Sequence, residues 1–238
     1  MKWEGIDVSK WQGVIDWDAV AHSGVKFAIL KAGGSDASVF YKDATFESNY
    51  SNAKRCGVHV GAYYFVGPGC VNAESGAADA RRFIEILRGK QLDMPVYIDF
   101  EAPSAKDKVG NTAACAAFCE VMEEAGYFAG IYSSDISGFV DRLNMKSLEP
   151  WTWWVARYGS EPKRAVANLH IWQKSSKGRV NGIAGDVDLD ECYVDFPSII
   201  KARGLNGYKA SGEPQPVVKT IEQRVSELEA RVSKLEGR

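Results

Sequence analysis

Hydrophobic and polar positions follow two alternating periods along the first half of the chain. Short runs rich in β-branched and aromatic residues predict strands at 5–9, 27–31, 58–65, 94–99 and 128–132. Between them, apolar residues recur at helical spacing. These segments predict helices at 16–22, 43–56, 73–87 and 113–124. Asn111 and Thr112 are expected to cap the last of these helices.

This alternation weakens after residue 132. Further strands are expected at 151–156, 169–173 and 186–190, with a short helix before the first and a last helix at 196–203. Strands that alternate with helices are typical of a parallel sheet with right-handed crossovers. The pattern therefore predicts an α/β barrel whose later strands lack full helices.

The composition changes at Gly204. Gly, Ser and Pro are frequent from 204 to 216, which indicates a linker after a barrel of residues 1–203. From Val218 to Leu235, Val alternates with Ile or Leu at spacings of three and four, so residues 217–238 predict a coiled-coil helix. Charges on both flanks of this seam favour a homo-oligomer, dimer or trimer, through residues 217–236. The alternative is a lone amphipathic helix docked on the barrel.

Composition excludes several classes of protein. The 238 residues carry a formal net charge of −2, so charge predicts neither a nucleic-acid partner nor binding to a membrane surface. No run of 18 apolar residues is present, so membrane insertion is not expected. Five irregularly spaced cysteines argue against a disulfide framework, and no metal or cofactor is expected. The first residues lack the apolar segment of a signal peptide.

Two carboxylates, Asp99 and Glu101, end the strand that begins near Met94, with one aromatic residue between them. Side chains two apart on a strand share a face, so both acids are expected to point together, roughly 6.5 Å apart along the chain. Crowding and burial separate the pKa values of two such groups, which gives the acid and the base that glycoside hydrolysis requires. The alternative is a solvated acid pair in a loop after a core strand.

Other polar residues lie at the ends of other predicted strands. Asp7 ends the first strand and Asp188 lies in the eighth. The C-terminal ends of barrel strands form one face, so four carboxylates from three strands are expected to converge there. Taken singly, Asp7 is also explained as a turn cap and Asp188 as part of a loop acid cluster. The same ends carry side chains that suit either a sugar groove or barrel core: Tyr63, Tyr132, Trp154 and Gln173.

Seven short motifs, in order and at suitable spacing, resemble those of the family 25 glycoside hydrolases, the Chalaropsis-type lysozymes. They are Gly5-Ile-Asp-Val-Ser9, Gly61-Ala-Tyr-Tyr-Phe65, Tyr97-Ile-Asp-Phe-Glu101, Gly130-Ile-Tyr132, Trp154-Val-Ala-Arg-Tyr158, Ile171-Trp-Gln173 and Val187-Asp-Leu189. The resemblance runs from about residue 1 to 203. It implies a flattened TIM-like barrel, (β/α)5(β)3, and retaining cleavage of the β-1,4 bond between N-acetylmuramic acid and N-acetylglucosamine in peptidoglycan.

Carried onto this sequence, the resemblance implies that Glu101 is the general acid and then the base. Asp99 would be the nucleophile, or would orient the N-acetyl group of the substrate. Asp7 and Asp188 would hold and polarise this pair and raise the proton affinity of Glu101. The substrate groove would be lined by Tyr63, Tyr132, Trp154 and Gln173.

Two positions depart from the family pattern, which often has histidine where Tyr64 stands and asparagine where Asp190 stands. Strand alternation turns Tyr64 away from Tyr63, so little effect on catalysis is expected. Asp190 would add negative charge near the site and shift its pH optimum.

Two other functions remain open at this point: a non-catalytic cell-wall-binding module and a chitin-type acetamido-sugar hydrolase. The presence of all four acids argues against the binding module. The missing leader, the unpaired cysteines and the heptads suit a phage endolysin that is made in the host cytoplasm and acts on the cell wall. A secreted bacterial enzyme without its leader is the alternative.

Overall fold

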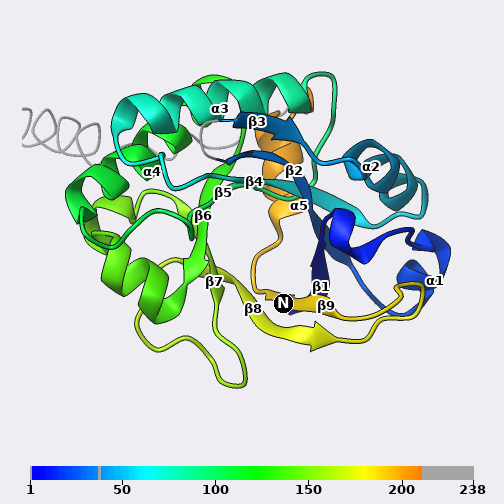
Figure 1. Cartoon of the computed structure of the whole chain (residues 1–238). Coiled ribbons are helices and arrows are strands. Elements are labelled where there is room, and N and C mark those ends of the chain that lie inside the picture. Colours follow the sequence, from blue (N-terminus) through cyan, green and yellow to red (C-terminus); the bar gives the residue numbers. More distant parts are fainter. Residues whose placement is uncertain (1, 37–38, 211–238) are drawn as a thin grey trace, which may run out of the picture.

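The computed structural model describes residues 2–36 and 39–210. Within them, eight strands close into a barrel because β1 pairs with both β2 and β9, and β3 extends the sheet beside β2 (Figure 1). The strands are β1 (Trp3–Val8), β2 (Phe27–Asp36), β3 (Val39–Lys42), β4 (His59–Phe65), β5 (Val96–Asp99), β6 (Ala129–Ser134), β7 (Thr152–Ala156), β8 (Leu169–Gly178) and β9 (Val187–Cys192).

In the part of the chain that the structure describes, five α-helices and three short helical turns connect or follow these strands. They are α1 (Trp17–His22), α2 (Phe46–Arg55), α3 (Ala73–Leu87), α4 (Lys108–Glu124) and α5 (Phe196–Arg203), with η1 (Lys10–Gln12), η2 (Asp135–Val140) and η3 (Met145–Leu148). In the barrel, neighbouring strands from β1 to β8 run parallel. The exceptions are β3, which lies outside the barrel and is antiparallel to β2, and β9, which is antiparallel to both β8 and β1. Within residues 152–192, all of which the structure describes, no α-helix separates β7, β8 and β9 (Figure 1). The predicted α/β barrel with a helix-poor second half is confirmed.

The β2–β3 hairpin was not expected, because two glycines after Lys31 indicated the end of a strand. Instead β2 continues to Asp36 and pairs with β3 in antiparallel register. A Cβ atom on Gly33 would overlap the carbonyl oxygen of Tyr41, which lies on β3. These glycines therefore serve close packing of the backbone rather than a turn, and the predicted strand end was wrong.

Helix α4 also begins earlier than the predicted residue 113. Asp107 is its N-cap, and its Oδ1 accepts a hydrogen bond of 2.9 Å from the Gly110 N–H. The expected caps lie inside the helix. Asn111 donates to the carbonyls of Ser104 and Arg142 instead, so its amide holds two loops together.

The barrel interior is apolar at one end and polar at the other. Phe27, Ile29 and Tyr97 fill its centre, and α5 adds Phe196 and Ile200. Phe196 packs against the aromatic rings of Phe128 and His170, which lie at the starts of β6 and β8. Helix α5 therefore closes the base of the barrel, where the parallel strands begin, and leaves the opposite end for polar groups.

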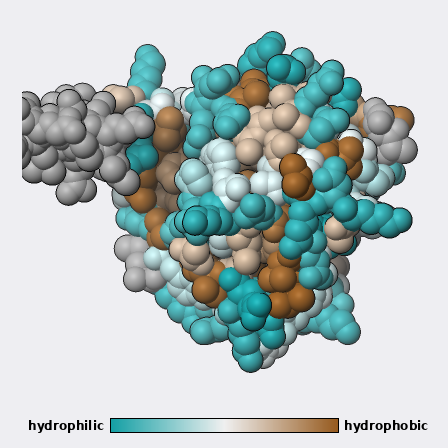
Figure 2. Space-filling view, turned by 90° about the vertical axis from the view of Figure 1, so that its left-hand side faces the viewer, coloured by the Kyte–Doolittle hydropathy of each residue, from teal (hydrophilic) through white to brown (hydrophobic). Residues whose placement is uncertain are grey.

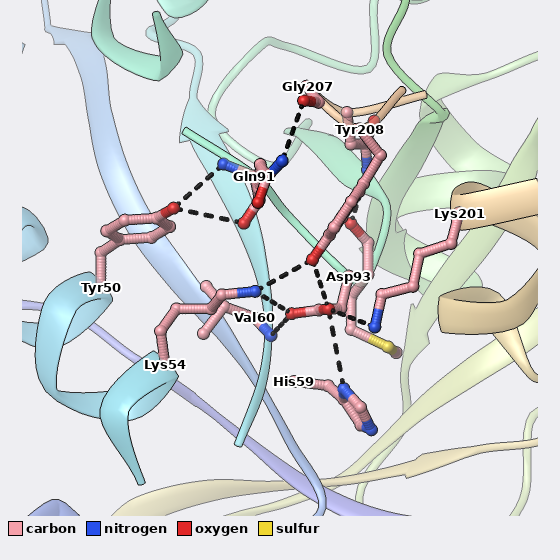
Figure 3. Close-up of polar contacts among 11 residues, drawn as sticks. Tyr50, Lys54, His59, Val60, Gln91, Asp93, Lys201, Gly207 and Tyr208 are labelled. Atoms are coloured by element: carbon pink, nitrogen blue, oxygen red, sulfur yellow. Dashed lines mark hydrogen bonds and ion pairs between the residues drawn. The ribbon is translucent and has the colours of Figure 1, made fainter. Parts of the chain in front are cut away.

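The folded barrel extends beyond its predicted boundary at Arg203. Asn206 is fully buried, accepts from the Phe128 N–H at 2.7 Å and donates to the Met94 carbonyl at 2.9 Å. Tyr208 reaches the carboxylate of Asp93 (Figure 3). Residues 204–208 are thus part of the barrel rather than of a linker. Linker residues 211–216 and the predicted helix 217–238 lie outside the described residues.

The outer surface is mixed in character. On the face shown in Figure 2, apolar side chains lie in small groups between hydrophilic ones. Among the helices that the structure describes, none combines the length and the apolar character needed to cross a membrane.

Candidate active site

A cavity of about 390 Å³ opens at the C-terminal end of the strands. Its lining includes Asp7 from β1, Asp188 from β9, Asp99 at the end of β5 and Glu101 two residues beyond. The four acids that the sequence placed at one end of the barrel therefore surround one cavity. Tyr63 from β4 lines it beside them.

The alternation of β5 explains why its two acids share a side. Ile98 and Phe100 are fully buried in the outer core between the sheet and the helices. The Phe100 N–H continues the strand pairing by donating to the Tyr132 carbonyl at 2.9 Å. This contact holds the backbone extended for one residue past the strand, so Glu101 emerges on the same side as Asp99.

Gln173 links Asp7 to two tyrosines. Its Nε2 donates to Asp7 Oδ2 at 2.7 Å, and its Oε1 accepts from the hydroxyls of Tyr132 at 2.9 Å and Tyr158 at 3.1 Å. Gln173 has only 3% of its surface exposed. Its place is therefore beneath the cavity, where it fixes Asp7, rather than along the expected groove lining.

Trp154 is likewise buried rather than exposed to a groove. Its indole packs against the rings of Tyr63, Tyr97 and Tyr132, and its Nε1 donates to Asp190 at 2.8 Å. Only 1% of its surface is exposed. Of the four residues expected to line the groove, Tyr63 lines the cavity directly. The strand ends are tightly packed, so the other rings form the floor beneath it.

The pKa values of Asp99, which is buried, and of Glu101, which is exposed at the mouth of the cavity, are both raised. The pKa of Asp99 lies well above its usual range because the group is buried and Glu101 is close, while Lys31 opposes the shift. Asp99 Oδ1 is buried without a hydrogen-bond donor among the described residues. The pKa of Glu101 is raised by burial and lowered by the cations Lys31 and Arg142. Two adjacent groups with raised pKa values favour retention of a proton between them.

Asp188 and Asp7 are shifted in the same direction. Burial raises the pKa of Asp188 to about 6, opposed by a backbone hydrogen bond and increased by the charge of Glu101. Burial also raises the pKa of Asp7, with further increases from Asp190, Asp188 and Asp99. The repulsion between Asp188 and Glu101 raises the pKa of Asp188, and burial is the first cause of the raised pKa of Glu101. The polarising role of Asp7 and Asp188 stays a prediction.

Several residues of the cavity were not singled out from the sequence as site residues. Lys31, Gln12 and Phe65 line it, as does Trp11, which has 79% of its surface exposed. The Lys31 ammonium lies 4.5 Å from the centre of the Phe65 ring. Lys31 follows Phe27 and Ile29 on the inward-facing positions of β2, so strand alternation was a signal that could have identified it.

The cysteines lie apart from this cavity. All five are free thiols, and burial raises the pKa of Cys115 and Cys119 well above the usual range. In residues 2–36 and 39–210, no group of three or more His, Cys, Asp or Glu side chains is arranged to hold a metal ion. The carboxyl groups that line the cavity can transfer protons and attack an electrophilic carbon.

A barrel with carboxyls at the ends of β1, β5 and β9 is the arrangement of a glycoside hydrolase site. The model of the glycosyl hydrolases family 25 matches residues 6–183, and the chain belongs to that family.

Individual relatives agree with this assignment. The chain is 29% identical to an autolytic lysozyme of Clostridium acetobutylicum over 79% of its length and 55% of the relative's. It is 32% identical to lysozyme M1 of Streptomyces globisporus, over 79% of this chain and 67% of that one. Its fold matches the crystal structure of the CTP1L endolysin with a TM-score of 0.73 and 27% identity, covering 84% of this chain and 70% of the other. The chain thus spans about half to two thirds of the curated relatives it matches.

Proposed function

We propose that this protein is a lysozyme that cleaves the β-1,4 bond between N-acetylmuramic acid and N-acetylglucosamine in peptidoglycan, with net retention. The observation that carries the proposal is the convergence of Asp7, Asp99, Glu101 and Asp188 on one cavity. The lysozymes among its relatives support the choice of substrate.

Glu101 is the general acid in this mechanism. Desolvation raises its pKa above the ordinary value, which favours the protonated form that delivers a proton to the oxygen of the leaving sugar. It then accepts a proton from the incoming water in the second step. Lys31 and Arg142 oppose the shift, which leaves the proton available for transfer.

Asp99 stabilises the positive charge that develops at the anomeric carbon, either by attacking that carbon or by orienting the N-acetyl group of the substrate. Both acids follow one strand and lie on one side of it, which favours the second role, because a nucleophile must reach the opposite face of the sugar. Asp7 and Asp188 shape the charge around this pair. Tyr63 contacts the sugar, and Tyr132, Trp154 and Gln173 support the floor.

The test is Glu101→Gln, assayed by release of reducing sugar from purified peptidoglycan. The variant keeps the shape of the side chain and loses its proton, so kcat should fall about a thousandfold while the circular dichroism spectrum is unchanged. Glu85→Gln, on the exposed face of α3, removes the same charge away from the cavity and should behave like the wild type. A Glu101→Gln variant with wild-type turnover would refute the assignment.

Two alternatives predict other results. A wall-binding module would bind purified peptidoglycan without releasing reducing ends. A chitin-type hydrolase would turn over chitin oligomers faster than peptidoglycan. Mass spectrometry of the digested wall fragments identifies the bond that is cut and distinguishes all three functions.

The setting we propose is that of a phage endolysin acting on the bacterial cell wall, as the similarity to an endolysin structure supports.

We further propose that residues 217–236 associate with those of other copies of the chain, so that several catalytic barrels act together on the cell wall. Light scattering should show a lower oligomer mass after deletion from Gly212 onward. An unchanged number of subunits would contradict this role.

A further inference from the structure

Asp190 is a buried carboxyl below the catalytic cavity. It lies on β9 with none of its surface exposed. Trp154 Nε1 donates to its Oδ1 at 2.8 Å, but its Oδ2 is buried and has no hydrogen-bond donor among the described residues. An ionised oxygen in such a place is costly, because neither water nor a donor replaces its lost hydration.

Asp7 is the neighbour that can satisfy this oxygen. It lies on β1, where Asp7 pairs with Asp188 and Gly5 pairs with Asp190, so Asp7 and Asp190 are diagonal neighbours on the inner face. Their side chains are within hydrogen-bond reach, and the contact with Asp7 lowers the pKa of Asp190. Two carboxylates have no donor between them, whereas a carboxyl and a carboxylate form a strong hydrogen bond through one proton.

The surroundings do not neutralise two negative charges. The titratable groups around Asp190 are Asp7 from β1, Tyr97 from β5, Lys174 from β8, and Asp188 and Cys192 from β9. The cation in this set, Lys174, is paired with Glu4 at 2.6 Å and with Glu191 at 2.8 Å. Burial and the charge of Asp188 raise the pKa of Asp190, and burial with the charge of Asp190 raises that of Asp7.

We propose that Asp190 is a positioning residue whose Oδ2 shares one proton with Asp7 in the working enzyme, so that the two side chains together carry one negative charge. The shared proton holds Asp7 against Gln173 and keeps a second charge away from the floor of the cavity. Its catalytic consequence rests on the proposed lysozyme function, whereas the shared proton itself does not.

The first test measures the proton without an activity assay. Asp190→Asn keeps an acceptor for Trp154 and offers Asp7 an N–H donor, but it has no proton to lose. A raised pKa in the folded state stabilises the protein fully below the unfolded pKa near 4, and this stabilisation is lost as pH rises through the folded pKa. The unfolding constant of the wild type should therefore rise relative to Asp190→Asn by up to about tenfold per pH unit above pH 4.

If the ratio of the wild-type unfolding constant to that of Asp190→Asn does not change with pH, the proposal of a shared proton is refuted. The matched control is Asp186→Asn, which removes the same charge just before β9 from an exposed aspartate paired with Arg179 at 2.9 Å. Its unfolding constant should follow the pH dependence of the wild type.

The second test measures the positioning role through the pH profile of kcat/KM on peptidoglycan. Asp190→Ala leaves Asp7 with the Gln173 donor alone and should lose at least tenfold in kcat, whereas Asp190→Asn adds a donor at position 190 and should recover most of that loss. In the wild type, part of the decline of kcat/KM at alkaline pH should come from loss of the proton shared by Asp7 and Asp190. The Asp190→Asn variant should lack that part of the decline. Equal activities of the Ala and Asn variants would overturn the role. Absence of turnover in every variant, wild type included, would refute the lysozyme function and leave the unfolding test valid.

Discussion

The base of the barrel carries a charge cluster whose removal has a calculable effect. Lys54, Tyr208, Lys201 and His59 surround the carboxylate of Asp93 (Figure 3). The Lys54 ammonium lies 2.7 Å from Oδ2, while the Tyr208 hydroxyl lies 2.7 Å and the Lys201 ammonium 3.1 Å from Oδ1. Asp93→Asn keeps the shape of the side chain and removes its charge, so the cations are left without their common partner.

The magnitude follows from burial. The Asp93 side chain is 4% exposed, whereas those of Lys54 and Lys201 are 27% and 46% exposed. Breaking a buried ion pair costs about 3–5 kcal/mol when the remaining charge stays buried. Both lysines reach solvent and can rehydrate, so we expect the lower end, about 3 kcal/mol. That is a large part of the ~5–15 kcal/mol that stabilises a typical domain.

Urea unfolding at pH 7, followed by tryptophan fluorescence, measures this loss. Asp18→Asn is the matched control, because Asp18 forms an ion pair with Arg55 at 3.0 Å in which both side chains are more than half exposed. Its unfolding midpoint should equal that of the wild type. A loss below about 1 kcal/mol for Asp93→Asn would refute the reasoning, since it would give the buried cluster the value of a surface pair.

The same variant gives a pH test. Burial favours a higher pKa for Asp93, but the nearby His59 and the hydrogen bonds from Lys54 and Tyr208 outweigh it and hold the pKa well below its usual range. The stabilisation is therefore present above the unfolded pKa near 4 and is lost as pH falls toward the folded pKa. The difference in stability between wild type and Asp93→Asn should shrink below about pH 4. A constant difference would show that charge is not its source.

Three further changes test other parts of the structure. Lys31→Met removes a cation that lowers the pKa of Asp99 and Glu101, so the alkaline limb of kcat/KM on peptidoglycan should move to higher pH. Gly33→Ala should lower the melting temperature and cost about 1–3 kcal/mol, because the added Cβ meets the β3 backbone. Asp135→Ala should speed proteolysis between residues 157 and 168, because the carboxylate accepts three backbone N–H groups at 2.8–3.0 Å there. Each account is contradicted if its variant leaves the measured quantity unchanged: the alkaline limb for Lys31→Met, the melting temperature for Gly33→Ala, or the rate of cleavage for Asp135→Ala.

The position of the acids could be predicted because it depends on two geometric rules. Alternation along a strand places Asp99 and Glu101 on one side, and closure of the barrel brings Asp7, near the end of β1, beside Asp188, near the start of the antiparallel β9. Neither rule needs knowledge of the side-chain packing. Both are properties of the backbone, which the hydrophobic pattern already determines.

What could not be predicted depends on contacts between distant residues. From the sequence, Gly33 indicates a turn, whereas in the structure it allows the backbone of β3 to pack closely against β2. Trp154 suits a sugar groove until the rings beside it are seen to bury it. Asn206 lies in a segment with the composition of a linker, yet its side-chain amide forms hydrogen bonds with the backbone of Met94 and Phe128, just before β5 and β6. In each case local propensity is overridden by tertiary packing, which a single sequence does not reveal.

The pKa of a carboxyl is shifted in opposite directions at the two ends of the barrel. This difference accounts for which end is suited to acid catalysis. At the base, Asp93 meets Lys54 and Lys201, so its charge is compensated and its proton is lost. At the cavity, burial raises the pKa of Asp99 and of Glu101, and the cations Lys31 and Arg142 oppose the shift of Glu101 without reversing it. A carboxyl whose pKa is raised is better able to hold a proton and give it to a leaving oxygen. Desolvation without a compensating partner therefore favours the proton at the mouth of the barrel, whereas ion pairs remove it at the base.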